Sequence, residues 1–113
     1  MNEKRADRLS SIVQKAISDI IQYKVKSDKV GFVTVTAAKV TRDLSYCYVY
    51  VSILNDPHHE KFEALNKIKG FVRTELGHEV QMRKVPEIVF KLDESIENYR
   101  HIEELLEEGK KTD

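Results

Sequence analysis

The spacing of the apolar residues changes sharply within the first half of the chain, and this change limits the folds that are open to it. Over residues 9–21 apolar side chains recur every three or four positions, which places them on one face of a helix. From residue 32 onward the period is two, which is typical of strands. The sequence therefore predicts an amphipathic helix over residues 7–24 whose apolar face packs on a sheet. The apolar positions of this helix are Leu9, Ile12, Val13, Ala16, Ile17, Ile20 and Ile21.

Two strands are predicted over residues 32–38 and 44–54. A short polar break, residues 41–43, separates them and favours an antiparallel hairpin. In the first strand, Val33, Val35 and Ala37 are expected on one face, with Thr36 and Ala38 on the other. In the second strand aliphatic residues alternate with tyrosines, so the tyrosines are expected on the face away from the helices.

The regular spacing of Tyr46, Tyr48 and Tyr50 allows two interpretations. Aromatic rings on an open sheet can stack on the bases of single-stranded nucleic acid. Tyrosine also favours strands, and it suits a sheet that is covered on one side only. Since no ribonucleoprotein motif accompanies the tyrosines, the structural interpretation is favoured over stacking.

Residues 62–76 form a second helical pattern that a glycine interrupts. The apolar positions are Phe62, Leu65, Ile68, Val72 and Leu76. Glycine in a helix interior costs about 1 kcal/mol relative to alanine, so the triplet Ile68, Lys69 and Gly70 predicts a helix kink. The pattern resumes with Phe71 and is expected to continue to about residue 85, where Pro86 closes it.

A third strand is predicted after Pro86, because Ile88, Phe90 and Leu92 alternate with Glu87, Val89 and Lys91. An acidic C-terminal helix with a fraying, flexible tail is expected over residues 95–113. The order helix, strand, strand, helix, kink, helix, strand and final helix predicts an α+β domain over residues 1–94, with a three-stranded sheet and helices on one face. This order matches the type II K-homology fold.

The formal net charge is zero, but the charges are unevenly distributed. Residues 1–42 hold nine Lys or Arg against four Asp or Glu, residues 43–92 hold seven of each, and residues 93–113 hold three against eight. This gradient suggests a basic face for a polyanion and an acidic tail kept away from it, or ordinary solvated helix surface.

Several function classes find no support in the sequence. No run of 18 apolar residues and no apolar leader is present, so neither a membrane span nor a signal peptide is expected. The single cysteine, Cys47, favours a reducing cytoplasm. Adjacent His58 and His59 do not share a helix face, and no phosphate-binding glycine loop or paired nucleophile and base is visible. We therefore expect no metal, no cofactor and no catalytic activity.

Several stretches of the chain resemble the bacterial ribosome-binding factor A family, in order and over about ninety residues. They are Arg5 and Arg8, the strand 33–36, the break 41–44, the strand 49–52, and the segments 70–73, 76–77 and 82–87. The resemblance implies a type II K-homology-like fold and a cytoplasmic, monomeric factor. It also implies binding to the small (30S) ribosomal subunit and its 16S rRNA, assistance in late maturation and processing of the rRNA precursor, and a role in cold adaptation. Other ribosome assembly factors are further candidate partners.

The nucleic-acid site is expected to differ from that of ordinary K-homology domains. Those domains clamp nucleic acid with a Gly-x-x-Gly loop, and the glycines at 31, 70, 77 and 109 never have that spacing. In the family, a helix kink built on Ala-x-Gly takes the place of this loop. This chain has Ile68 at the position of the alanine.

Without a clamp, binding would depend on basic side chains that reach phosphates. The predicted contacts are Arg5, Arg8, Lys15, Lys39, Arg42, Lys69, Arg73, Arg83 and Lys84. The alternative is a protein-interaction module without direct RNA contact, which would use the acidic last helix or a sheet edge.

Overall fold

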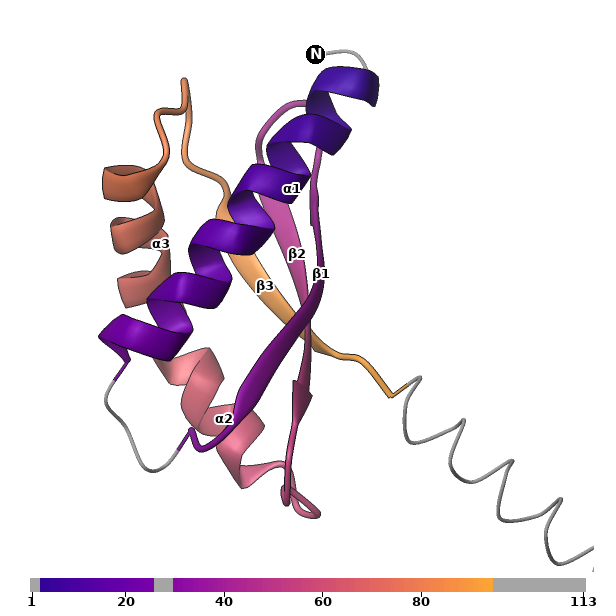
Figure 1. Ribbon diagram of the computed structural model, residues 1–113, viewed down its shortest axis with the longest axis vertical. Helices are drawn as coiled ribbons and strands as arrows, with labels where there is room; N and C mark the ends of the chain where they lie inside the picture. Colours follow the sequence, from indigo (N-terminus) through magenta and orange to yellow (C-terminus); the bar gives the residue numbers. More distant parts are fainter. Residues whose placement is uncertain (1–2, 26–29, 95–113) are drawn as a thin grey trace, which may run out of the picture.

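The computed structural model describes residues 3–25 and 30–94, and the order of the elements within them is the predicted one (Figure 1). The final helix and tail predicted for residues 95–113 lie outside the described residues. None of the described helices is long and apolar enough to cross a membrane. The elements are α1 (Glu3–Asp19), a π-helical turn η1 (Ile20–Lys24), β1 (Val33–Val40), β2 (Tyr46–Ile53), α2 (Glu60–Lys67), α3 (Lys69–Glu79) and β3 (Glu87–Leu92).

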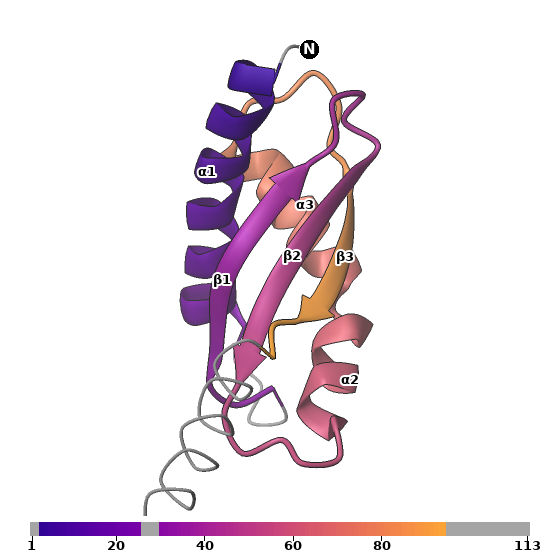
Figure 2. The same cartoon turned by 90° about the vertical axis from the view of Figure 1, so that its right-hand side faces the viewer.

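The three strands form one sheet in the order β1-β2-β3. The hairpin makes β1 and β2 antiparallel, and the crossover through α2 and α3 returns the chain so that β3 runs parallel to β2. The described helices lie on one face of this sheet, as predicted, and none of them lies on the other face, which we call the bare face (Figure 2).

The core lies between the helices and the covered face of the sheet. Its fully buried residues come from the predicted apolar stripes, which confirms which faces point inward. Ile12 lies at the margin of its stripe and remains 49% exposed. The side chains with no exposed surface are Val13, Ile17, Ile20, Cys47, Val49, Val51, Leu65, Val72 and Leu76.

The predicted alternation in the first strand is wrong after Val35, because a β-bulge interrupts the pairing there. Val35 pairs with Val51 but Ala37 pairs with Tyr50, so Thr36 is an extra residue. After the extra residue, each position of β1 points to the face opposite to the predicted one. Ala38 packs against the core and Ala37 is exposed.

The kink is confirmed within the predicted triplet, but glycine does not form it. Helix α2 ends at Lys67, and Ile68 has φ −103° and ψ 11° before α3 begins at Lys69. The amide of Ile68 bonds the carbonyl of Leu65, which is the tighter three-residue hydrogen bond of a helix end. Gly70 lies in the first turn of α3, and a Cβ atom there would meet nothing within 4 Å.

The helix after the kink, α3, is shorter than the predicted pattern to about residue 85. It ends at Glu79, and Val80 is extended. The residues from 80 to 86 instead form a loop that folds back on α3. A Cβ atom on Gly77 would approach Val85 to 3.1 Å, which shows how closely the loop packs. Phe71 was expected in the apolar pattern but is 43% exposed.

Candidate nucleic-acid interface

All nine basic residues predicted to contact phosphate have exposed side chains, but they do not form one surface. Three segments bring five of them to one end of the molecule, the upper end in Figure 1. These segments are the start of α1, the loop between β1 and β2, and the loop between α3 and β3. We call this set the basic end, and its members are Arg5, Arg8, Arg42, Arg83 and Lys84.

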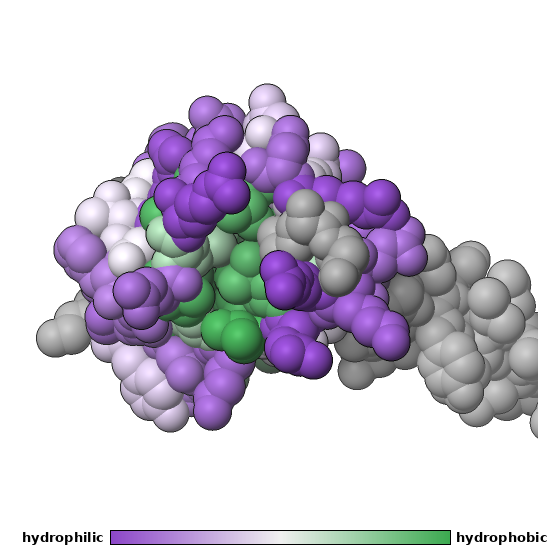
Figure 3. Space-filling model, turned by 90° about the horizontal axis from the view of Figure 1, so that it is seen from above, coloured by the Kyte–Doolittle hydropathy of each residue, from purple (hydrophilic) through white to green (hydrophobic). Residues whose placement is uncertain are grey.

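Backbone and side-chain contacts hold the three segments together. The amide of Glu87, just after the α3–β3 loop, bonds the carbonyl of Ser45 in the β1–β2 loop at 3.0 Å. Arg42 of that second loop forms an ion pair with Glu3 at the start of α1. Figure 3 views this end from above and shows hydrophilic residues around a smaller hydrophobic area.

The β1–β2 loop is shaped by Asp43. Its carboxylate accepts hydrogen bonds from the amide of Ser45 at 3.0 Å and the hydroxyl of Thr41 at 2.9 Å. These donors stabilise the charged form and lower the pKa of Asp43 to about 2. The ordered loop fixes the backbone that carries Arg42.

Arg73 adjoins the basic end by a different contact. Its guanidinium donates to the carbonyl of Val85 at 3.0 Å, which ties α3 to the loop that carries Arg83 and Lys84. The remaining predicted residues lie elsewhere: Lys69 at the kink, Lys15 farther along α1, and Lys39 on the sheet.

Lys39 belongs to the bare face of the sheet, where the structure also places Lys91. The alternation in the sequence puts Lys91 on the face opposite Phe90, but it indicates no role for this lysine. The strand order shows that both lysines lie beside the tyrosines, because β3 pairs Lys91 with Tyr50 and β1 pairs Lys39 with Tyr48. The tyrosines lie on this face as predicted.

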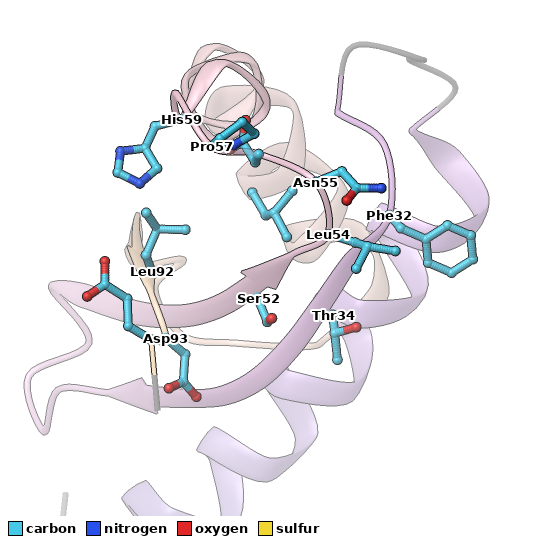
Figure 4. Close-up of a pocket in the computed structure, with 12 residues that line it drawn as sticks. Phe32, Thr34, Ser52, Leu54, Asn55, Pro57, His59, Leu92 and Asp93 are labelled. Atoms are coloured by element: carbon cyan, nitrogen blue, oxygen red, sulfur yellow. The ribbon is translucent and has the colours of Figure 1, made fainter. Parts of the chain in front are cut away.

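A hollow of about 650 Å³ lies at the end of the molecule opposite the basic end (Figure 4). Its lining contains exposed Phe32 and Leu54, together with Asp93 and Glu94, and no Lys or Arg of the described residues. Asp93 accepts a hydrogen bond of 2.6 Å from Thr36. A hollow of this composition does not suit phosphate.

The described residues hold no group of three or more His, Cys, Asp or Glu that is placed to bind a metal. Cys47 is buried in the core, and burial raises the pKa of its thiol to about 11. It is therefore protonated at neutral pH and a poor nucleophile.

The architecture is that of a type II K-homology-like domain, with a helix break at Ile68 between α2 and α3. The family model described as "Ribosome-binding factor A" matches residues 5–106. Ribosome-binding factor A of Natranaerobius thermophilus is 46% identical over 110 residues, which span 96% of this chain and 84% of that protein. The chain belongs to the ribosome-binding factor A family.

Solved structures of the family have the same fold. The crystal structure of ribosome-binding factor A from Thermus thermophilus matches with a TM-score of 0.71 at 23% identity, covering 77% of this chain and 93% of that one. A homology model of the Thermus thermophilus factor, fitted into a cryo-EM map of its complex with the 30S subunit, matches with a TM-score of 0.67 at 22% identity. That match covers 79% of this chain and 96% of the other.

Proposed function

We propose that this protein binds the small (30S) ribosomal subunit and its 16S rRNA through the basic end. The observation that carries the proposal is the convergence of three separate segments, each with exposed Arg or Lys, in a member of the ribosome-binding factor A family. The Thermus thermophilus relative is described in complex with the 30S subunit, which supports the same partner here.

The geometry favours recognition of RNA shape. Loops that project from one end of a small domain can reach the backbone phosphates of a folded RNA, and such contacts set position without reading sequence. Arg8, Arg83 and Lys84 form no ion pair with other residues of the described ranges, so their charges are available to phosphates.

The finer role that we propose is late maturation of the subunit. By holding the rRNA precursor in one conformation, the protein would make a processing site accessible to the enzymes that cut it. The same stabilisation is most useful in the cold, where misfolded RNA rearranges slowly. The site of action would be the cytoplasm, with the protein acting as a monomer.

The test compares two triple variants that remove the same charge. One replaces Arg8, Arg83 and Lys84 with alanine, and the other replaces Lys15, Lys67 and Lys69, which are exposed but lie away from the basic end. Binding to purified 30S subunits is measured by co-sedimentation at several salt concentrations. The first variant should bind more weakly and with a salt slope lower by about 2–3. The second should resemble wild type.

An equal loss in both variants, with melting temperatures unchanged, would refute the assignment to the basic end. A loss in the second variant alone would place the contact near the kink or along α1.

A second candidate function is protein interaction through the hollow in Figure 4. Phe32 and Leu54 are 79% and 62% exposed there, which is unusual for large apolar residues. Replacing both with serine should leave 30S binding unchanged if the basic end is the main contact.

A further inference from the structure

We propose that the bare face of the sheet is a second RNA surface, which takes an extended single strand. In this arrangement Tyr46, Tyr48 and Tyr50 stack on bases, while Lys39 and Lys91 contact phosphates. We call these five residues the tyrosine face. The inference rests on the proposed function only in taking RNA as the partner, because its residues lie outside the basic end.

The first support is that the three tyrosines lie on the bare face, on the central strand. The helices of the described residues pack against the opposite face of the sheet (Figure 2). Tyr46 is 44% exposed, and the other two tyrosines are partly exposed. The aliphatic residues between them point into the core, so the tyrosine rings are not required to fill it.

The spacing of the rings suits a single strand. The ring centroids of Tyr46 and Tyr48 are 6.3 Å apart, with their planes inclined by 24°. Bases within a duplex are stacked about 3.4 Å apart, so neighbouring bases of a duplex cannot each lie on one of these rings. An unstacked, extended strand can place successive bases that far apart.

Two lysines flank the tyrosines from the two edge strands. Lys39 of β1 is paired with Tyr48, and Lys91 of β3 is paired with Tyr50, so each lysine lies beside its tyrosine on the same face. The ammonium group of Lys91 is 5.0 Å from the centre of the Tyr48 ring, a cation–π distance. One cation on each side of a row of rings is an arrangement that can hold a phosphate backbone beside stacked bases.

Glu87 pairs with Tyr46 and Asp93 accepts a hydrogen bond from Thr36, but no acidic residue of the described ranges lines the hollow that contains the two lysines. A hollow of about 350 Å³ is lined by Lys39, Thr41, Tyr48, Tyr50 and Lys91. Within the described ranges neither lysine is paired with a carboxylate. Two such cations, Lys39 beside the tyrosines and Lys91 over the Tyr48 ring, favour an anionic, aromatic ligand over an apolar protein surface, which would have to desolvate both charges.

The test measures fluorescence anisotropy of labelled single-stranded RNA, ten uridines or ten adenines, with the full-length protein. Binding of a ten-base-pair RNA duplex is measured in the same way for comparison. Wild type should bind the single strands more tightly than the duplex. Replacing Tyr48 and Tyr50 with alanine should weaken single-strand binding at least tenfold, whereas Tyr48→Phe with Tyr50→Phe keeps the rings and should bind like wild type.

Two further variants separate the contributions. Lys39→Ala with Lys91→Ala should lower both affinity and the salt slope, by about 0.7 for each phosphate that is no longer neutralised. Thr34→Ala with Ser52→Ala changes a paired position on the same face and should have no effect. If the alanine variant of the tyrosines does not fold, the phenylalanine and lysine variants still decide the question.

Single-strand binding that survives removal of the tyrosine rings and the lysines would overturn the inference, as would equal affinity for the duplex or no binding by wild type. None of these results affects the proposed function, which is tested by binding of the basic-end variant to 30S subunits. A basic-end variant that loses the subunit but keeps the oligonucleotide would show that the two surfaces are independent.

Discussion

The hydroxyl of Ser10 in α1 accepts a hydrogen bond of 2.9 Å from the amide of Val40, the last residue of β1. Strand β1 lies at an edge of the sheet that the described residues form, so within them this amide has no neighbouring strand to bond. A helix side chain supplies the acceptor instead, and it fixes the start of the loop that carries Arg42 against α1.

Replacing Ser10 with alanine should destabilise the protein. Ser10 is 9% exposed, and its removal leaves a buried amide without an acceptor, which costs about 1–3 kcal/mol. Urea unfolding followed by circular dichroism measures the difference. Ser11→Ala is the matched control, because the Ser11 hydroxyl bonds the Asp7 carbonyl at an exposed position and its removal should cost less than about 0.5 kcal/mol. Similar losses of stability in both variants would contradict the role given to Ser10.

Asp56 caps the N-terminus of helix α2. It lies three residues before His59, the residue that precedes the helix. Its two carboxylate oxygens accept from the amides of Lys61 at 2.8 Å and Phe62 at 3.0 Å. Asp56→Ala should lower the free energy of unfolding by about 0.5–2 kcal/mol. Asp56→Asn keeps one of the two acceptors and should fall between alanine and wild type. An asparagine variant as unstable as the alanine variant would argue against the two-amide cap.

Gly70→Ala should stabilise the protein by about 0.4–1 kcal/mol, because the helical backbone at Gly70 suits alanine and the space around it is open. Thermal unfolding measures the change. Binding to 30S subunits should stay unchanged if the basic end is the contact. A more stable variant with weaker binding would show that the partner approaches the kink closely.

Asp43 predicts a specific dependence of stability on pH. Hydrogen bonds, first from the Ser45 amide and then from the Thr41 hydroxyl, lower its pKa from 3.8 to about 2. The folded state therefore favours the carboxylate, and the stabilisation is complete above the unfolded pKa and lost as pH falls from about 4 to about 2.

The measurement is the difference in free energy of unfolding between wild type and Asp43→Asn across this range. The difference should be constant above about pH 5 and should shrink below pH 4. A difference that stays constant down to about pH 2 would show that Asp43 is not held by these donors.

The sequence predicted the elements well because each apolar stripe has one clear period. The tyrosine strand is the best example, since Cys47, Val49 and Val51 are completely buried and Tyr46 is exposed. The prediction failed at Thr36, where a two-residue period cannot reveal an extra residue. Alanine occupies both of the next two positions, so the composition fits either register.

The kink and the basic end show two further limits. Gly70 was the visible interruption in its helix, yet the break occurs at Ile68 through a change of hydrogen bonding that no residue type announces. The basic residues were chosen for their charge alone. Their grouping depends on the parallel return of β3, which brings Arg83 and Lys84 beside the β1–β2 loop, and the sequence did not show this strand order.

The basic end draws its residues from the two ends of the folded domain and from its middle, so it is complete only when the last strand has joined the sheet. A chain that has formed its first helix and hairpin presents only part of the surface. A partner that binds the complete surface therefore raises the free energy of unfolding of the whole domain, by about 2.7 kcal/mol when its free concentration is one hundred times Kd. Docking and the final step of folding are in this way thermodynamically linked.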